Sequence, residues 1–331
     1  MLNRKALTNN KRKETAMEFE DIKKFLLECD NVSILTHKSP DGDTFGSAFA
    51  LCRVLRGMGK KANVLCSDGF PKRYDFLYEG YVEESFDEKC VIAVDIADTM
   101  LIGSKLPQYT QEKVIDLCID HHVSNKMFAK QTYVDADASA TAMIMFELFK
   151  YMQIDIDKQV ATCLYTGIAT DTGCFKYENT TRQAHIAASE LMSYGIEFSV
   201  INRKMFDVKS KSRLAIEQIV TSNIEFYFND RVSVIVITKE MMKNSGADDS
   251  DFEGLAAIPL SVEGVDIGIT VKQRHTEVFK ISVRTTDVFD ASLFCRQFGG
   301  GGHIRAAGCE ICGTLEDVKR IILKALEELF Q

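Results

Sequence analysis

The stretch that decides the fold is Thr36-His37-Lys38-Ser39-Pro40-Asp41-Gly42-Asp43. The apolar run at residues 31–35 precedes it and predicts a buried parallel strand, and residues 45–58 have the periodicity of a helix. Pro40 and Gly42 predict a tight turn between that strand and that helix. The polar side chains then lie at the carboxyl end of a strand, where open α/β sheets place their ligand sites. By itself, the stretch is equally well explained as an acidic loop that caps a helix.

Further polar residues follow other predicted elements at the point where each one ends. Residues 90–94 form a wholly apolar run followed by Asp95, and residues 114–119 predict a further strand, followed by Asp120-His121-His122. A helix predicted over residues 158–170 leads directly into Asp171. Strands that alternate with helices predict an α/β fold with a doubly wound parallel sheet. The carboxyl ends of these strands meet at one edge, so we expect the polar residues to converge.

The converging set contains more carboxylates than one protein site tolerates without a counterion. Unpaired carboxylates at this density would repel one another and raise one another's pKa values. Bound divalent cations remove that conflict, and the number of ligands is sufficient for two ions. Imidazole with carboxylate favours Mn²⁺ over Mg²⁺, and the lack of cysteine in the set disfavours Zn²⁺. The set comprises His37, Asp41, Asp43, Asp95, Asp120, His121, His122 and Asp171.

The C-terminal third has a different pattern, which predicts a smaller mixed α/β domain over residues 223–331. A hairpin is expected around Asn229-Asp230, followed by strands at 266–272, 279–284 and 306–312 and helices at 290–298 and 315–330. Residues 196–222 are expected to form a helical connector. Within the domain, Gly299-Gly300-Gly301-Gly302-His303 either forms a flexible linker or lets backbone N–H groups approach a phosphate. Arg284 and His303 would add positive charge there.

Composition restricts the class of protein. The chain has 331 residues, 46% of them hydrophobic, and a formal net charge of −8, which argues against nonspecific coating of long nucleic acids. Ten cysteines, scattered except for Cys309 and Cys312, which have CxxC spacing, predict free thiols in a reducing cytoplasm. No apolar run reaches the length of a membrane span. Residues 1–17 are expected to be a basic, disordered tail, with a transit peptide as the alternative.

These motifs together resemble the DHH phosphoesterases. The elements that carry the resemblance are His37-x-x-x-Asp41-x-Asp43, Asp95, Asp120-His121-His122 and Asp171, in that order. The glycine run with His303, and Arg284 upstream, resembles the DHHA1 substrate-binding domain. The resemblance implies a catalytic DHH domain at residues 18–195, a DHHA1 domain after the connector, and an active site in the cleft between them.

The resemblance also implies roles for single residues. His37 and Asp41 would hold one metal ion, and Asp43 and His121 the second. Asp95 would bridge the two ions and Asp171 would complete the cluster. His122 would face the substrate phosphate and the leaving oxygen, and Asp120 would orient an imidazole from outside the ligand set. Arg284, Gly299, Gly300, Gly301, Gly302 and His303 would bind substrate.

The subgroup that the chain resembles degrades very short RNA and dephosphorylates 3′-phosphoadenosine 5′-phosphate (pAp). The expected substrates are therefore short 5′-phosphorylated RNA or DNA oligonucleotides and pAp. The main alternative is a phosphodiesterase of cyclic or linear dinucleotides such as pApA. An inorganic pyrophosphatase, a long-strand exonuclease and a binding protein without catalysis fit the motifs less well. No membrane partner is expected, and the sequence leaves a homodimer open.

Overall fold

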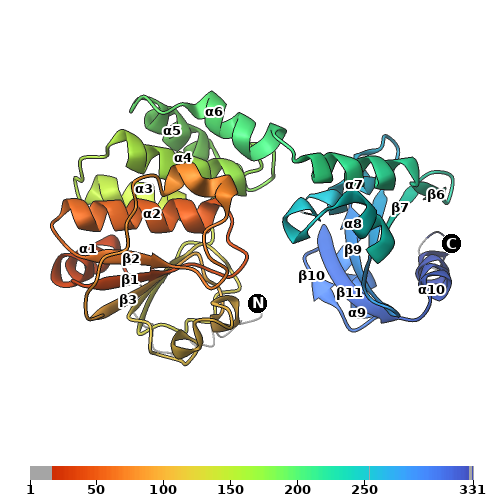
Figure 1. Cartoon of the computed structure of the whole chain (residues 1–331), viewed down its shortest axis with the longest axis horizontal. Helices are drawn as coiled ribbons and strands as arrows, with labels where there is room; N and C mark the ends of the chain where they lie inside the picture. The colour runs from red at the N-terminus through yellow and green to blue at the C-terminus, as the bar shows by residue number, and fades with distance from the viewer. Residues whose placement is uncertain (1–16, 253, 328–329, 331) are drawn as a thin grey trace, which may run out of the picture. The chain divides into compact units, whose positions relative to one another are not determined.

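Two compact units make up this computed structural model, residues 1–208 and 209–331 (Figure 1). The structure describes residues 17–252, 254–327 and 330, so nearly all of the expected basic tail lies outside the described residues. The segment expected as a helical connector is divided: residues 198–207 belong to the first unit, and the helix from Lys211 to Ser222 belongs to the second.

The first unit contains the predicted parallel sheet, with strand order β2-β1-β3-β4-β5. The order reverses at β1, so the carboxyl ends of β1 and β3 form the switch point where doubly wound sheets bind ligands. β5 was not predicted, because this edge strand mixes polar and apolar residues and is not buried. The strands are β1 (Val32–Leu35), β2 (Ala62–Leu65), β3 (Cys90–Val94), β4 (Leu117–Asp120) and β5 (Gln131–Val134).

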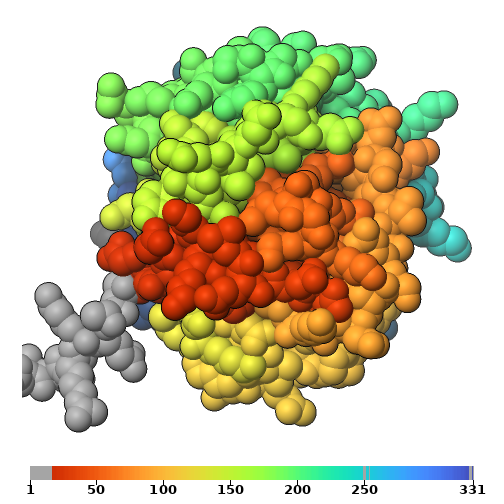
Figure 2. Space-filling model, turned by 90° about the vertical axis from the view of Figure 1, so that its left-hand side faces the viewer, coloured from red at the N-terminus to blue at the C-terminus, as the bar shows by residue number. Residues whose placement is uncertain are grey.

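Helices pack on one face of this sheet around the larger apolar core, which includes Phe45, Phe49, Phe146 and Phe149. Short 3₁₀ helices and loops cover the other face around a smaller core. Figure 2 shows the layering from the side, with α1 and neighbouring residues in red between green helices and yellow loops. The helices are α1 (Phe19–Glu28), α2 (Gly42–Gly57), α3 (Thr141–Tyr151), α4 (Lys158–Asp171), α5 (Arg182–Met192), α6 (Phe198–Asn202), a π-helix (Arg203–Asp207), η1 (Lys72–Leu77), η2 (Thr99–Leu101) and η3 (Pro107–Tyr109).

The second unit is built on a mixed sheet, with order β10-β11-β9-β8-β7-β6. β7 and β8 are parallel and the other pairs are antiparallel, and the hairpin predicted around Asn229-Asp230 is confirmed as β6–β7. One apolar core includes residues of α9 and α10, and another includes residues of α7. The strands are β6 (Glu225–Tyr227), β7 (Val232–Ile237), β8 (Ile267–His275), β9 (Val278–Thr285), β10 (Gly301–Gly302) and β11 (Ala306–Cys312); the helices are α7 (Lys211–Ser222), α8 (Lys239–Ser245), α9 (Ala291–Arg296), α10 (Leu315–Glu327), η5 (Asp249–Phe252), η6 (Leu255–Ala257) and η7 (Pro259–Ser261).

The predicted turn before α2 requires a correction. The helix begins at Gly42, three residues earlier than expected, because the Asp41 side chain caps it by accepting hydrogen bonds from the backbone N–H groups of Asp43 and Thr44. Asp43 therefore lies in the first helical turn and not in a loop. Gly42 allows this close packing, since a β-carbon there would lie 2.4 Å from Oγ1 of Thr170 on α4. No helix among the described residues is long and apolar enough to cross a membrane.

Candidate active site

The polar residues predicted to converge do lie together at the carboxyl ends of β1, β3 and β4. Three overlapping groups have ligand atoms within 4.8 Å of one another. One contains His37, Asp41 and Asp95; another contains Asp43, His121 and Asp171; and a third contains Asp95, His121 and His122. All three lie in the first unit.

Asp95 occupies the centre of this arrangement. Its backbone has a φ of 59°, a left-handed conformation that is unusual for a residue other than glycine and is common where function requires strain. Its Oδ2 lies 3.6 Å from Nε2 of His37, and its Oδ1 lies 3.6 Å from Nε2 of His121. The two oxygens of one buried carboxylate therefore face two different imidazoles.

The orientation of His37 and His121 fits metal ligation. Nδ1 of His37 lies 2.8 Å from the carbonyl oxygen of Lys38, and Nδ1 of His121 lies 3.2 Å from that of Ala138. Metal-ligating histidines typically donate Nδ1–H to a carbonyl in this way, and a bound cation would take the place of a proton on Nε2. Those Nε2 atoms lie 3.6–4.0 Å from carboxylate oxygens, which is too long for a hydrogen bond.

The separations also suit two ligands of one ion. Metal–ligand distances of about 2.0–2.2 Å place neighbouring ligand atoms roughly 3–3.6 Å apart. The residues present therefore fit divalent cations, and the donor set contains nitrogen and oxygen but no sulfur.

His122 differs from the other two histidines. Its Nδ1 is 2.7 Å from Oδ1 of Asp120, and its side chain is 43% exposed, whereas the side chains of His37 and His121 are 16% and 14% exposed. Asp120 is fully buried, and Nδ2 of Asn125 also donates to it at 2.6 Å. The hydrogen bond to Asp120 raises the pKa of His122 to about 9.

The carboxylates of the site conflict electrostatically when no cation is present. Burial, together with the nearby charges of Asp95 and Asp171, raises the pKa of Asp43 well above its usual value. Burial likewise raises the pKa of Asp171 to about 7. Burial acts against a charged His37, but the carboxylates of Asp41 and Asp95 outweigh it and raise the pKa of His37 to about 11. A divalent cation would stabilise the ionised forms of Asp43 and Asp171, and it would take the place of the second proton on His37.

Sequence reasoning missed the residues that hold the ligands in place. The N-terminus of α3 donates two backbone N–H groups to Asp43, from Thr141 at 2.7 Å and from Ala142 at 2.8 Å. The Thr141 hydroxyl donates to Oδ1 of Asp95 at 3.0 Å. Since β5 ends at the same edge of the sheet, recognising that strand would have placed residues 135–142 at the site.

The residues predicted to bind substrate lie in the second unit. Arg284 is on β9, paired with Ala306 of β11, and the glycine run ends in the short β10–β11 hairpin. Gly301, Gly302 and His303 are exposed. A β-carbon at Gly300 would lie 2.3 Å from the Gly308 carbonyl oxygen, whereas one at Gly301 would meet nothing within 4 Å. The run is thus an ordered turn, not a flexible linker.

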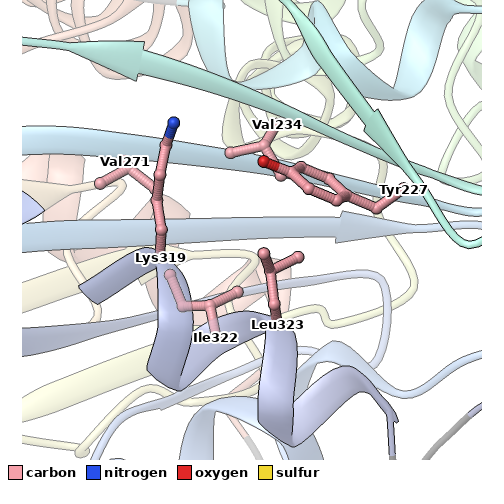
Figure 3. Close-up of a pocket in the computed structure, with 6 residues that line it drawn as sticks. All are labelled: Tyr227, Val234, Val271, Lys319, Ile322 and Leu323. Carbon is pink, nitrogen blue, oxygen red and sulfur yellow. The ribbon is translucent and has the colours of Figure 1, made fainter. Parts of the chain in front are cut away.

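A crevice in the same unit, between the sheet and α10, does not involve these residues. Figure 3 shows its lining of apolar side chains with Tyr227 and Lys319. Both polar groups bond to the Glu225 carboxylate, Lys319 through Nζ and Tyr227 through its hydroxyl. Both polar side chains that line the crevice therefore already have a partner within the protein.

Comparison with protein families identifies the chain. The model of the DHH family, N-terminal domain, matches residues 31–168, and that of the DHHA1 domain matches residues 229–331. A Thermus thermophilus protein named bifunctional oligoribonuclease and PAP phosphatase NrnA is 31% identical over 90% of this chain and 89% of its own length. The chain belongs to the DHH family. It is therefore a hydrolase acting on phosphoric ester bonds, of a metal-dependent family.

Two further matches are relevant. The crystal structure of an exopolyphosphatase-related protein from Bacteroides fragilis has a TM-score of 0.82 and 30% sequence identity, covering 94% of this chain and 95% of that one. The Bacillus subtilis protein named cyclic-di-AMP phosphodiesterase GdpP is 23% identical over 94% of this chain, but only 49% of its length is covered.

Proposed function

We propose that the protein is a two-metal phosphoesterase, with Mn²⁺ as the preferred ion, that acts on very short 5′-phosphorylated oligonucleotides and on pAp. It would release mononucleotides from the oligonucleotides in the 5′-to-3′ direction and convert pAp to AMP. The observation that carries the proposal is Asp95, whose two oxygens face His37 and His121 separately, as a carboxylate shared by two ions requires.

Two ligand groups follow from this geometry. His37 and Asp41 would hold one ion, Asp43, His121 and Asp171 would hold the other, and Asp95 would contribute one oxygen to each. When bound, divalent ions activate water as a nucleophile and neutralise the charge of phosphate oxygens. Imidazole and carboxylate together favour Mn²⁺ over Mg²⁺.

His122 is proposed to contact the substrate phosphate and the leaving oxygen. Its Nδ1–H is held by Asp120, so the ring is fixed while the side chain remains partly exposed. With its pKa raised to about 9, the His122 ring carries both protons at neutral pH, so Nε2–H can donate to a phosphate oxygen, where a hydrogen bond that strengthens as charge develops lowers the barrier. Asp120 would then act through His122, as a positioning residue.

The second unit is proposed to bind the 5′-phosphate of the substrate. The Arg284 guanidinium would donate charge-assisted hydrogen bonds, and His303 would add a further donor. Along the glycine run, the exposed backbone of Gly301 and Gly302 would approach the phosphate, since the N–H groups of Gly299 and Gly300 already donate to the carbonyl oxygens of Arg296 and Cys295. With the 5′-phosphate held there, the next phosphate along the chain is the one hydrolysed. In pAp this is a terminal monoester, and in a short oligonucleotide it is the first diester.

The substrate class is supported by the name of the Thermus thermophilus relative, an oligoribonuclease and PAP phosphatase that matches along nearly its whole length. The second candidate, hydrolysis of cyclic or linear adenine dinucleotides, is supported by the cyclic-di-AMP phosphodiesterase relative. This chain spans about half of that protein, which makes the second candidate the weaker one.

A comparison of turnover across substrates tests the proposal. The full chain is assayed with Mn²⁺, Mg²⁺ or a chelator on pAp, a 5′-phosphorylated RNA trimer, pApA and cyclic di-AMP. We expect Mn²⁺-dependent hydrolysis of pAp and the trimer, with the 5′-terminal nucleotide of a labelled trimer released first. If cyclic di-AMP were the best substrate, the second candidate would be favoured. If the 3′-terminal nucleotide were released first, this would contradict binding of the 5′-phosphate by the second unit.

A further inference from the structure

Residues 138–142, which lead into α3 and form its start, contain no predicted metal ligand, yet they contact three of the six proposed ligands directly, namely Asp43, Asp95 and His121. We propose that this segment positions one of the two metal-binding groups, that of Asp43, His121 and Asp171, and that Thr141 is its central positioning residue. The inference rests on the proposed two-metal function. It adds to that function a residue that orients the ligands of one ion and not those of the other.

Thr141 contacts two carboxylates at once. It is fully buried; its backbone N–H donates to Oδ2 of Asp43 at 2.7 Å, and its hydroxyl donates to Oδ1 of Asp95 at 3.0 Å. Asp95 Oδ1 is the oxygen that faces His121, while Oδ2 faces His37. The Thr141 hydroxyl therefore fixes Oδ1 of Asp95, the oxygen that would bind the same ion as His121.

The rest of the segment holds the other two members of the same group. The carbonyl oxygen of Ala138 lies 3.2 Å from Nδ1 of His121. The carbonyl oxygen of Ser139 accepts a hydrogen bond from Nδ2 of Asn179 at 3.1 Å, and the same amide lies 3.4 Å from Oδ2 of Asp171. Asp43, His121 and Asp171 are thus each anchored to these five residues, directly or through one side chain.

The metal-binding group of His37 and Asp41 is held by different hydrogen bonds. His37 is held through the carbonyl oxygen of Lys38 in the β1–α2 connection, and Asp41 through the N–H groups of Asp43 and Thr44 in the first turn of α2. Only Asp95 is common to both groups. A change confined to Thr141 is therefore expected to weaken one ion much more than the other, because partners that orient metal ligands typically contribute about 10–100-fold to metal affinity.

Three substitutions in the full-length protein test this. Thr141→Val keeps nearly the same shape without the hydroxyl, Thr141→Ser restores it, and Thr166→Val is the matched control. Thr166 is also fully buried, but its hydroxyl bonds only to the carbonyl oxygen of Thr162 in its own helix. Mn²⁺ binding is measured without substrate, from the electron paramagnetic resonance signal of the free ion, and thermal unfolding is measured in chelator.

For Thr141→Val we expect one of two Mn²⁺ ions to bind about 10–100-fold more weakly while the other changes less than about 3-fold. Thr141→Ser and Thr166→Val are expected to bind both ions as the wild type does. If Thr141→Val does not fold, Asn179→Ala tests the same group through Asp171, with the same expected loss of one ion.

Three results would overturn the inference: normal binding of both ions by Thr141→Val, equal weakening of both ions, or Thr141→Ser as defective as Thr141→Val. A wild-type protein that binds only one ion would instead refute the proposed two-metal function. The two failures are distinguishable. Failure of the positioning role is measured on the variants, whereas failure of the two-metal function is measured on the wild type.

Discussion

The polar residues of the two units are held in opposite ways. In the first unit, Asp43, Asp95 and Asp120 are buried, and each accepts hydrogen bonds that fix its orientation. In the second, Gly301, Gly302 and His303 are exposed on a short hairpin, and the described residues of that unit include no comparable cluster of metal-ligating side chains. Buried side chains of fixed orientation suit metal binding and catalysis, whereas exposed hydrogen-bond donors suit binding of a charged substrate. Substitutions in the first unit should therefore affect metal binding and kcat, and those in the second should affect KM.

The strongest test of this contrast is Asp95→Ala. Because each oxygen of Asp95 faces a different imidazole, we expect weaker binding of both Mn²⁺ ions and a loss of activity beyond the about 10–100-fold typical of groups outside the ligand set. Metal content and Mn²⁺-dependent turnover are measured together. Asp98→Ala is the control, since the Asp98 carboxylate lies outside the ligand groups and accepts a hydrogen bond from the Met100 N–H at the start of η2. Near-normal turnover of Asp95→Ala would exclude the bridging role.

His122→Ala separates catalysis from metal binding within the first unit. We expect both ions to remain bound while kcat falls about 10²–10³-fold, because the lost hydrogen bond acts mainly in the transition state. Elemental analysis and steady-state kinetics at saturating Mn²⁺ provide the two readouts. Loss of one ion would make His122 a ligand, as its place in the third group allows.

Arg284→Ala probes the second unit. A charge-assisted hydrogen bond contributes about 1.5–3 kcal/mol, so we expect KM to rise roughly 10–150-fold for both pAp and the RNA trimer, with metal content unchanged. Arg320→Ala on α10 serves as the control, because that exposed guanidinium pairs only with Asp317 in the described contacts. If the Arg284 variant were impaired on only one of the two substrates, this would argue against a 5′-phosphate-binding site that both substrates share.

The smallest expected effect is on KM, and it comes from substitution of Gly301, which we compare with substitution of its neighbour Gly300. Gly301→Ala meets open space, so we expect unchanged thermal stability and a KM increase of a few fold, because a methyl group would hinder the approach of a phosphate to the backbone. At Gly300 the β-carbon would lie against the Gly308 carbonyl oxygen and Cys309, and overpacking of this kind costs about 1–3 kcal/mol of stability. Unfolding curves and KM for pAp are the measurements. A Gly301→Ala protein with unaltered KM would remove that glycine from the binding surface.

The sequence by itself determined the chemistry of the site. Apolar runs that end in His37, Asp95 and Asp120 identify parallel strands with polar carboxyl ends, and parallel strands bring those ends to one edge whatever the details of packing. The same logic predicted the convergence of Asp41, Asp43 and His121, because each lies within a few residues of such a strand end. Asp171 is the last residue of α4, so its place beside His121 depends on how that helix packs.

Only the tertiary structure decided how those residues are held. The contacts from Thr141 to Asp43 and Asp95 join residues 98 and 46 positions apart, and Asn179 reaches Asp171 from the following loop. Local periodicity carries no signal for such contacts, and β5, which delivers the segment, is a half-exposed edge strand without a clear hydrophobic pattern. The helix start at Gly42 was missed for a related reason: it depends on the Asp41 side chain turning back to cap the backbone, and a turn that contains proline and glycine conceals this in the sequence.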